Sequence, residues 1–138
     1  MEQLAVEIVG LCREYGECRV EVERMEEARR VKNALESVCA MARQRLDISD
    51  PALLLALLDA YEVTRDEGML QEVLDVVGRN LDRLAVSAES VKLLACCYYY
   101  VEEEECVERA GRMLEELRKM GRGEEELADA ETILEELT

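Results

Sequence analysis

Residues 54–61, LLALLDAY, and residues 91–98, VKLLACCY, carry the same pattern of apolar side chains at an offset of 37 positions. The matched residues are Leu54, Leu57, Leu58 and Tyr61 in the first copy and Val91, Leu94, Ala95 and Tyr98 in the second. Their spacing of i, i+3, i+4 and i+7 puts them on one face of a helix. A second helix follows each copy, where Leu70, Val73 and Val77 correspond to Val107, Ala110 and Leu114. A helical hairpin that recurs in tandem is typical of a stacked α-solenoid.

The segment 51–121 resembles the tetratricopeptide-like repeats, a group of helical-hairpin solenoids. The resemblance lies in residues 57–61, LLDAY, in residues 94–98, LACCY, and in Ala110, Leu114 and Leu117 of the second helix. It implies a right-handed α-α superhelix and a concave face that binds other proteins. The period of 37 residues differs from the family's period of about 34, and HEAT-like repeats are the alternative.

The same periodicity predicts an all-α fold of about seven antiparallel helices in a single domain, residues 1–138. We expect an N-terminal helical hairpin over 1–46, two hairpin repeats over 51–121 and a C-terminal capping helix over 124–138. Within the first hairpin, a long helix over 20–46 is predicted. Its inner face would be Val31, Leu35, Val38, Ala42 and Leu46.

Several residues indicate where helices begin and end. Gly16 is expected to adopt the left-handed conformation after a first helix over 2–15, and Gly121 to end the sixth helix. Asp50 followed by Pro51 predicts an N-cap and a first helical residue, and Ser87 predicts another N-cap. The stretch 64–67, TRDE, predicts a capping box, in which Thr64 and Glu67 bond to each other's backbone amides.

The chain is strongly acidic, with 33 Asp and Glu residues against 17 Lys and Arg residues and a net charge of −16. It has no basic stripe of the kind that neutralises phosphate groups, which argues against nucleic acid as a partner. A membrane partner is not expected either, because no apolar run approaches the roughly 20 residues of a membrane helix. An acidic chain suits a basic protein partner, or the charge simply keeps the protein soluble.

Two further properties concern the source of the chain. The N-terminus lacks the features of a signal peptide, so we expect a cytoplasmic protein. The composition combines few amide side chains, no His and many charges of both signs, a trend of hyperthermophile proteins. A GC-rich genome would also favour the excess of Arg over Lys.

Six cysteines are present: Cys12, Cys18, Cys39, Cys96, Cys97 and Cys106. They can be buried thiols, which pack as small apolar side chains. They can also form disulfides, since Cys12 and Cys18 flank Gly16, while Cys97 or Cys96 and Cys106 flank the next hairpin turn. A metal site is disfavoured, because the chain has no C-x-x-C pair and no His.

No motif for catalysis or for a cofactor is found. The lack of His excludes the common triads and most general-base schemes, and no glycine-rich phosphate loop follows a strand. The acidic runs 102–105 and 124–126 lie at predicted helix starts, where the helix dipole favours negative charge. We therefore expect that the protein is not an enzyme and that it binds no metal and no cofactor.

Two features are candidates for a partner surface. One is the tyrosine set Tyr61, Tyr98, Tyr99 and Tyr100, because exposed Tyr is common at interfaces. The alternative is that these rings pack in the core or between helices, as is expected of Tyr98, which matches Tyr61. The other is the apolar stripe Leu127, Leu134 and Leu137 of the last helix. The expected function is a non-catalytic protein-protein interaction module, an adaptor or a small subunit. The alternative is a structural homo-oligomer or virion-type protein stabilised by disulfides.

Overall fold

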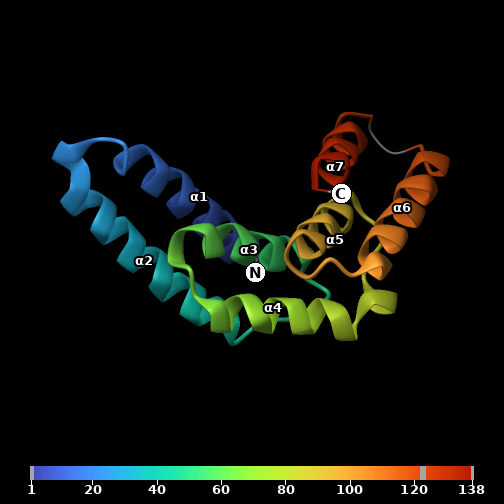
Figure 1. Ribbon diagram of the computed structural model, residues 1–138, viewed down its shortest axis with the longest axis horizontal. Coiled ribbons are helices and arrows are strands. Elements are labelled where there is room, and N and C mark those ends of the chain that lie inside the picture. The colour runs from blue at the N-terminus through green and yellow to red at the C-terminus, as the bar shows by residue number, and fades with distance from the viewer. Residues whose placement is uncertain (1, 122–123, 138) are drawn as a thin grey trace. The chain divides into compact units, whose positions relative to one another are not determined.

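The structure is a computed structural model that describes residues 2–121 and 124–137 (Figure 1). In these residues it has seven α-helices and no strand, which confirms the all-α prediction. The helices are α1 (Glu2–Cys18), α2 (Met25–Arg43), α3 (Pro51–Thr64), α4 (Glu67–Arg79), α5 (Ala88–Val101), α6 (Glu104–Lys119) and α7 (Glu124–Leu137). Two short 3-10 turns, Val22–Arg24 and Leu81–Arg83, precede α2 and follow α4.

The chain divides into two compact units, Met1–Val73 and Leu74–Thr138, which we call the N-terminal and the C-terminal unit. The boundary falls inside α4, so the two ends of this helix belong to different units. Each unit buries its own set of apolar side chains, and each is described separately below.

In the N-terminal unit, α1 packs against both α2 and α3 (Figure 1). Its core includes Ile8 of α1, Leu35 of α2 and Leu53 of α3, all with no exposed surface. The predicted inner face of the second helix is confirmed for Val31, Leu35, Val38 and Ala42. Leu46 lies beyond the end of α2 and is only half-buried, because the helix is shorter than predicted.

In the C-terminal unit, α5 packs against α6 and α7, and α6 also contacts α7. The buried faces consist of Val91, Leu93, Leu94, Ala95 and Cys97 on α5, then Cys106, Ala110, Met113, Leu114 and Leu117 on α6. Because α5 is apolar on most sides, it can be buried by two neighbours at once.

Three predicted helix ends are confirmed. Asp50 accepts a hydrogen bond from the backbone N–H of Leu53 at 3.3 Å, and Pro51 is the first residue of α3. Ser87 accepts one from the N–H of Ser90 at 3.1 Å and begins α5. Gly121 follows α6 with a φ of 69°, a left-handed conformation that glycine adopts without steric cost.

Gly16 does not end the first helix, and this prediction is wrong. Helix α1 continues through Gly16 to Cys18, whose side chain has no exposed surface. A glycine inside a helix costs roughly 1 kcal/mol. Continuation of the helix buries the Cys18 side chain, which offsets this cost. The predicted helix over 20–46 is accordingly shorter, since a 3-10 turn occupies its first residues.

The predicted capping box at residues 64–67 is also wrong. Asp66 caps α4 instead, because its Oδ1 accepts a hydrogen bond from the N–H of Met69 at 3.2 Å. Glu67 turns away from the helix end, and its Oε1 accepts a hydrogen bond from the Tyr61 hydroxyl at 2.5 Å. Asp is a stronger N-cap than Thr, so the cap moves two residues along the chain.

The connections after α3 and α5 share one backbone conformation at an offset of 37 residues. Arg65 has φ and ψ of 55° and 30°, and Glu102 has 53° and 32°. In each case the N–H bonds to a tyrosine carbonyl, that of Tyr61 at 2.8 Å and that of Tyr98 at 2.7 Å. Both residues carry a Cβ, so each occupies the left-handed region at a cost of roughly 1 kcal/mol.

Replacing Glu102 by glycine is therefore expected to stabilise the protein by about 0.5–1 kcal/mol, since glycine removes the left-handed strain. Chemical denaturation of Glu102→Gly and of the natural protein measures the difference. The matched control is Glu115→Gly, which places glycine on the exposed face of α6 and should cost about 1 kcal/mol. A loss of stability in Glu102→Gly would contradict the strain argument.

Candidate functional site

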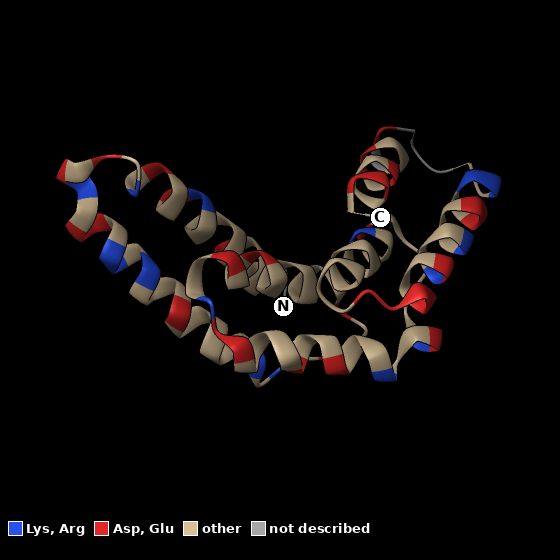
Figure 2. Ribbon diagram, viewed as in Figure 1, with Lys and Arg blue, Asp and Glu red and all other residues tan. Residues whose placement is uncertain are grey.

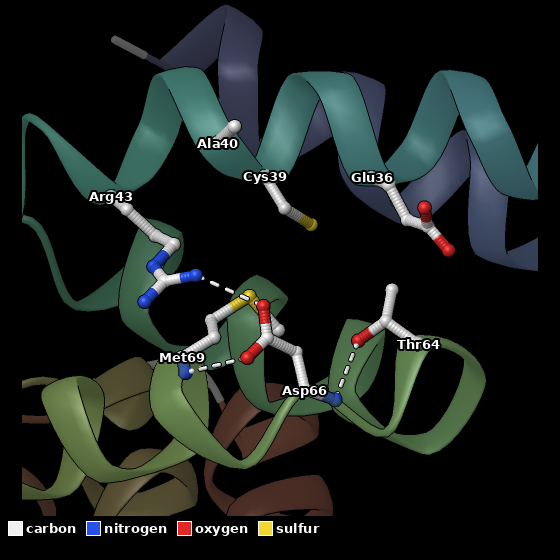
Figure 3. A pocket seen from close by; sticks show the side chains of 7 residues that line it. All are labelled: Glu36, Cys39, Ala40, Arg43, Thr64, Asp66 and Met69. Carbon is white, nitrogen blue, oxygen red and sulfur yellow. Dashed lines mark hydrogen bonds and ion pairs between the residues drawn. The ribbon is translucent and has the colours of Figure 1, made fainter.

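A pocket of about 300 Å³ lies in the N-terminal unit, between α2 and the connection from α3 to α4 (Figure 3). Glu36, Cys39, Ala40 and Arg43 form the side contributed by α2. Their spacing of i, i+3, i+4 and i+7 puts them on one helix face. The other side consists of Thr64 at the end of α3, Asp66 in the connection and Met69 of α4.

Arg43 lies at one end of the pocket and links the two sides of the pocket through hydrogen bonds. Its Nη1 donates to Asp66 Oδ2 at 2.9 Å, while Nε and Nη2 donate to the two carboxylate oxygens of Glu72 at 2.9 and 2.7 Å. The hydrogen bonds that Arg43 donates to Glu72, and next the charge of Glu72, raise the pKa of Arg43 above its usual range. The same hydrogen bonds, and the charge of Arg43, lower the pKa of Glu72. The guanidinium therefore stays charged and joins α2 to α4.

An acidic side chain lies at the opposite end of the pocket, and two sulfur-containing side chains form the floor of the pocket. Glu36 points toward Thr64 across the pocket, and no hydrogen bond joins it to the other lining residues (Figure 3). Cys39 and Met69, only 3% and 1% exposed, line the floor. Burial, with smaller contributions from Cys12 and Asp66, raises the pKa of Cys39 to about 12, so its thiol is neutral at physiological pH.

The sequence did not indicate this pocket. Arg43 reads as part of a solvated basic stretch on a helix, because its two acidic partners are 23 and 29 residues further along the chain. The helical spacing of Glu36, Cys39, Ala40 and Arg43 is the one available signal, and it does not distinguish a pocket wall from an exposed face.

The predicted tyrosine set is spread over several environments. Tyr61 is 7% exposed, with its hydroxyl bonded to Glu67 and the Arg65 guanidinium 5.6 Å from its ring centre. On α5, Tyr98 and Tyr100 are half-buried, whereas Tyr99 is 59% exposed. The rings of Tyr99 and Tyr100 meet edge to face, with 5.1 Å between their centres and 84° between their planes. Tyr99 thus offers the most ring surface to a partner.

The predicted stripe of the last helix is largely turned inward. Leu127 is 7% exposed, Ala130 has no exposed surface, and Leu134 and Leu137 are half-buried. Since α7 packs against α5 and α6, this stripe covers the hairpin that the two helices form.

All six cysteines are free thiols, and the disulfides considered above are not formed. Cys12 and Cys18 lie six residues apart on the continuous helix α1. That separation is about 9 Å of helix rise and exceeds the Cα–Cα range of a disulfide. Cys97 and Cys106 are buried at 2% and 3% exposure and pack as apolar side chains, while Cys96 is half-buried.

Other kinds of site find no support in the described residues. No three His, Cys, Asp or Glu side chains come together as metal ligands there. None of the described helices is long and apolar enough to cross a membrane. Lys and Arg are scattered among acidic residues on α2 and α6 instead of forming a continuous basic stripe (Figure 2).

Comparison of the chain with protein families, with curated proteins and with solved structures gives no match.

Replacement of Arg43 by alanine should destabilise the protein by about 1 kcal/mol, because it removes a bidentate ion pair between α2 and α4. Chemical denaturation at low salt measures the effect, which should shrink as NaCl is added. Arg29→Ala, on the exposed part of the same helix, is the matched control and should change little. Equal effects of the two variants would rule out a special role for Arg43.

Thermal stability should fall as the pH rises from 9 toward 11. Burial, with a smaller contribution from Asp59, raises the pKa of Cys12 from 9.0 to about 11, and burial also raises the pKa values of Cys39 and Cys97. Above pH 9 the unfolded chain releases these protons and the folded chain keeps them, so the free energy of unfolding decreases. Melting curves at several pH values test this, and Cys97→Ala should make the decrease shallower. A melting temperature constant up to pH 10.5 would contradict the argument.

Proposed function

We propose that this protein is a non-catalytic protein-protein interaction module, an adaptor or a small subunit of a complex. The observation that carries the proposal is the exposed ring of Tyr99, braced edge to face by Tyr100. A rigid aromatic side chain of this kind is a common anchor of protein interfaces, because its burial loses little conformational entropy.

The charge of the chain favours a partner with a basic surface. The net charge of −16 would speed the encounter with such a protein and disfavour acidic competitors. Asp and Glu occur on every helix of the described chain, whereas α3 and α5 show mostly uncharged residues (Figure 2). An apolar anchor on a strongly acidic chain fits a partner with a complementary apolar pocket and a basic surface around it.

The architecture that we propose is a tetratricopeptide-like superhelix of antiparallel hairpins. The offset of 37 residues supports it, because α3 and α5 both have 14 residues and both end in a left-handed residue bonded to a tyrosine carbonyl. In this view α3 with α4 and α5 with α6 are two copies of one hairpin. Helix α7 then acts as the cap that covers the last apolar surface.

The setting of the protein is a further proposal. Six free thiols fit the reducing conditions of the cytoplasm. The scarcity of amide side chains and the many ion-pairing charges fit a hyperthermophilic source.

A structural homo-oligomer is the second candidate. The observation that favours it is three exposed apolar residues within six positions of the sequence where α1 gives way to α2: Val20, Val22 and Met25 are 75%, 88% and 54% exposed. Such residues would be covered if a second copy packed on this segment.

Affinity capture with the tagged full-length chain from a lysate of the source organism separates the two candidates. A stoichiometric foreign protein supports the interaction module, and recovery of the bait alone, at a multiple of its mass in light scattering, supports the homo-oligomer. We expect Tyr99→Ala to lower partner recovery by about tenfold, since it removes an interface anchor. The melting temperature should not change.

Met120→Ala is the matched control for this variant. Met120 is a large apolar residue of the same unit and is exposed to a similar degree, 58%. Its replacement should leave partner recovery unchanged. Equal recovery with Tyr99→Ala and with the natural protein would remove the basis of the proposal.

A further inference from the structure

The pocket between α2 and the α3–α4 connection has the features of a binding site for one basic side chain. Its volume of about 300 Å³ is at the lower end of the range for ligand pockets, about 300–1,000 Å³. A space of this size suits a single extended side chain better than a nucleotide or a large cofactor. The pocket lies wholly within the N-terminal unit, so its geometry does not depend on the other unit.

The charges around the pocket select a cation. Arg43 is the one basic side chain among the lining residues, and its Nε, Nη1 and Nη2 atoms already donate to Asp66 and Glu72. Glu36 remains as an acidic group that the other lining residues do not engage (Figure 3). An anionic ligand would meet the carboxylates of Glu36 and Asp66 and a guanidinium that already donates to other groups, whereas a cation would find the Glu36 carboxylate available.

The pocket has an apolar floor and a polar mouth, which match the apolar stem and the charged end of a lysine side chain. Cys39, Met69 and Ala40 present sulfur and methyl groups, which can cover the four methylene groups of a lysine stem. At the mouth, the Thr64 methyl group points toward Glu36, and the Thr64 hydroxyl oxygen is turned toward the backbone N–H of Asp66 (Figure 3). The Thr64 hydroxyl oxygen accepts from the N–H of Asp66 at 3.4 Å and has a second lone pair for an ammonium proton.

We propose that this pocket takes a lysine side chain of the partner protein, with the stem over Cys39 and Met69 and the ammonium between Glu36 and Thr64. The inference rests on the proposed interaction function and adds to it a second, charge-selective contact, remote in sequence from Tyr99. The thiol at the floor stays neutral, since burial raises the pKa of Cys39 to about 12, and it adds no competing charge.

A titration of the isotope-labelled full-length protein with Nα-acetyl-lysine N-methylamide tests the proposal by nuclear magnetic resonance. We expect saturable shifts confined to the backbone amides around residues 36–43 and 64–69. The Nε-acetylated compound and the norleucine analogue carry the stem without the charge, and they should cause no saturable shift. Equal binding of either analogue, or the absence of shifts at the pocket, would overturn the proposal.

Two variants test whether the negative charge that lysine binding requires is that of Glu36. Glu36→Gln should weaken lysine binding by about fivefold, because it removes the ion pair and keeps the shape of the side chain. Glu26→Gln, an exposed position of the same helix outside the pocket, should bind as the natural protein does. Unchanged binding by Glu36→Gln would overturn the assignment.

The two proposals can fail separately. Capture of a partner that depends on Tyr99, together with no response of the pocket to lysine, would reject the pocket alone. A lysine response that depends on Glu36, together with no captured partner, would reject the interaction function and leave the pocket as a site for basic side chains.

Discussion

Burial of α3 is the constraint on which the N-terminal unit depends. Seven of its 14 residues are buried, and Leu53, Leu54 and Leu57 are at most 1% exposed. A helix this apolar has no stable isolated form in water, so other helices must cover it. Helices α1 and α2 do so in this unit, and their packing brings the face with Cys39 and Arg43 over the α3–α4 connection. The pocket is a consequence of that coverage.

The presence of the helices and the first residues of several of them could be predicted, because both depend on interactions between residues that are close in the sequence. Asp50 with Pro51, and Ser87, act through bonds to residues three positions away, within the reach of sequence reasoning. The predictions at Gly16 and Thr64 are wrong for two different reasons. At Gly16 the burial of Cys18 outweighs a local preference, a case in which tertiary burial overrides local propensity. At Thr64 a stronger cap, Asp66, lies two residues further on and competes locally.

The candidate site could be predicted only in part. An exposed tyrosine within residues 98–100 follows from the helical period, since three consecutive residues cannot all face one core. The pocket could not be foreseen, because Arg43 and Glu72 meet only after three helices have packed. The number of acidic residues does not indicate the pocket either. Glu36 is one of 33 acidic residues, and only its surroundings in the folded protein distinguish it from the others.

The matching turns at Arg65 and Glu102 have a consequence for how such hairpins can vary. The same left-handed backbone is held in both by one N–H bond to a tyrosine carbonyl, and the side chain takes no part in that bond. The two positions carry opposite charges on an identical backbone. The outward charge of a hairpin corner can therefore be reversed while the backbone conformation of the corner residue stays the same. Such corners are places where the charge presented to a partner can change without a change in that conformation.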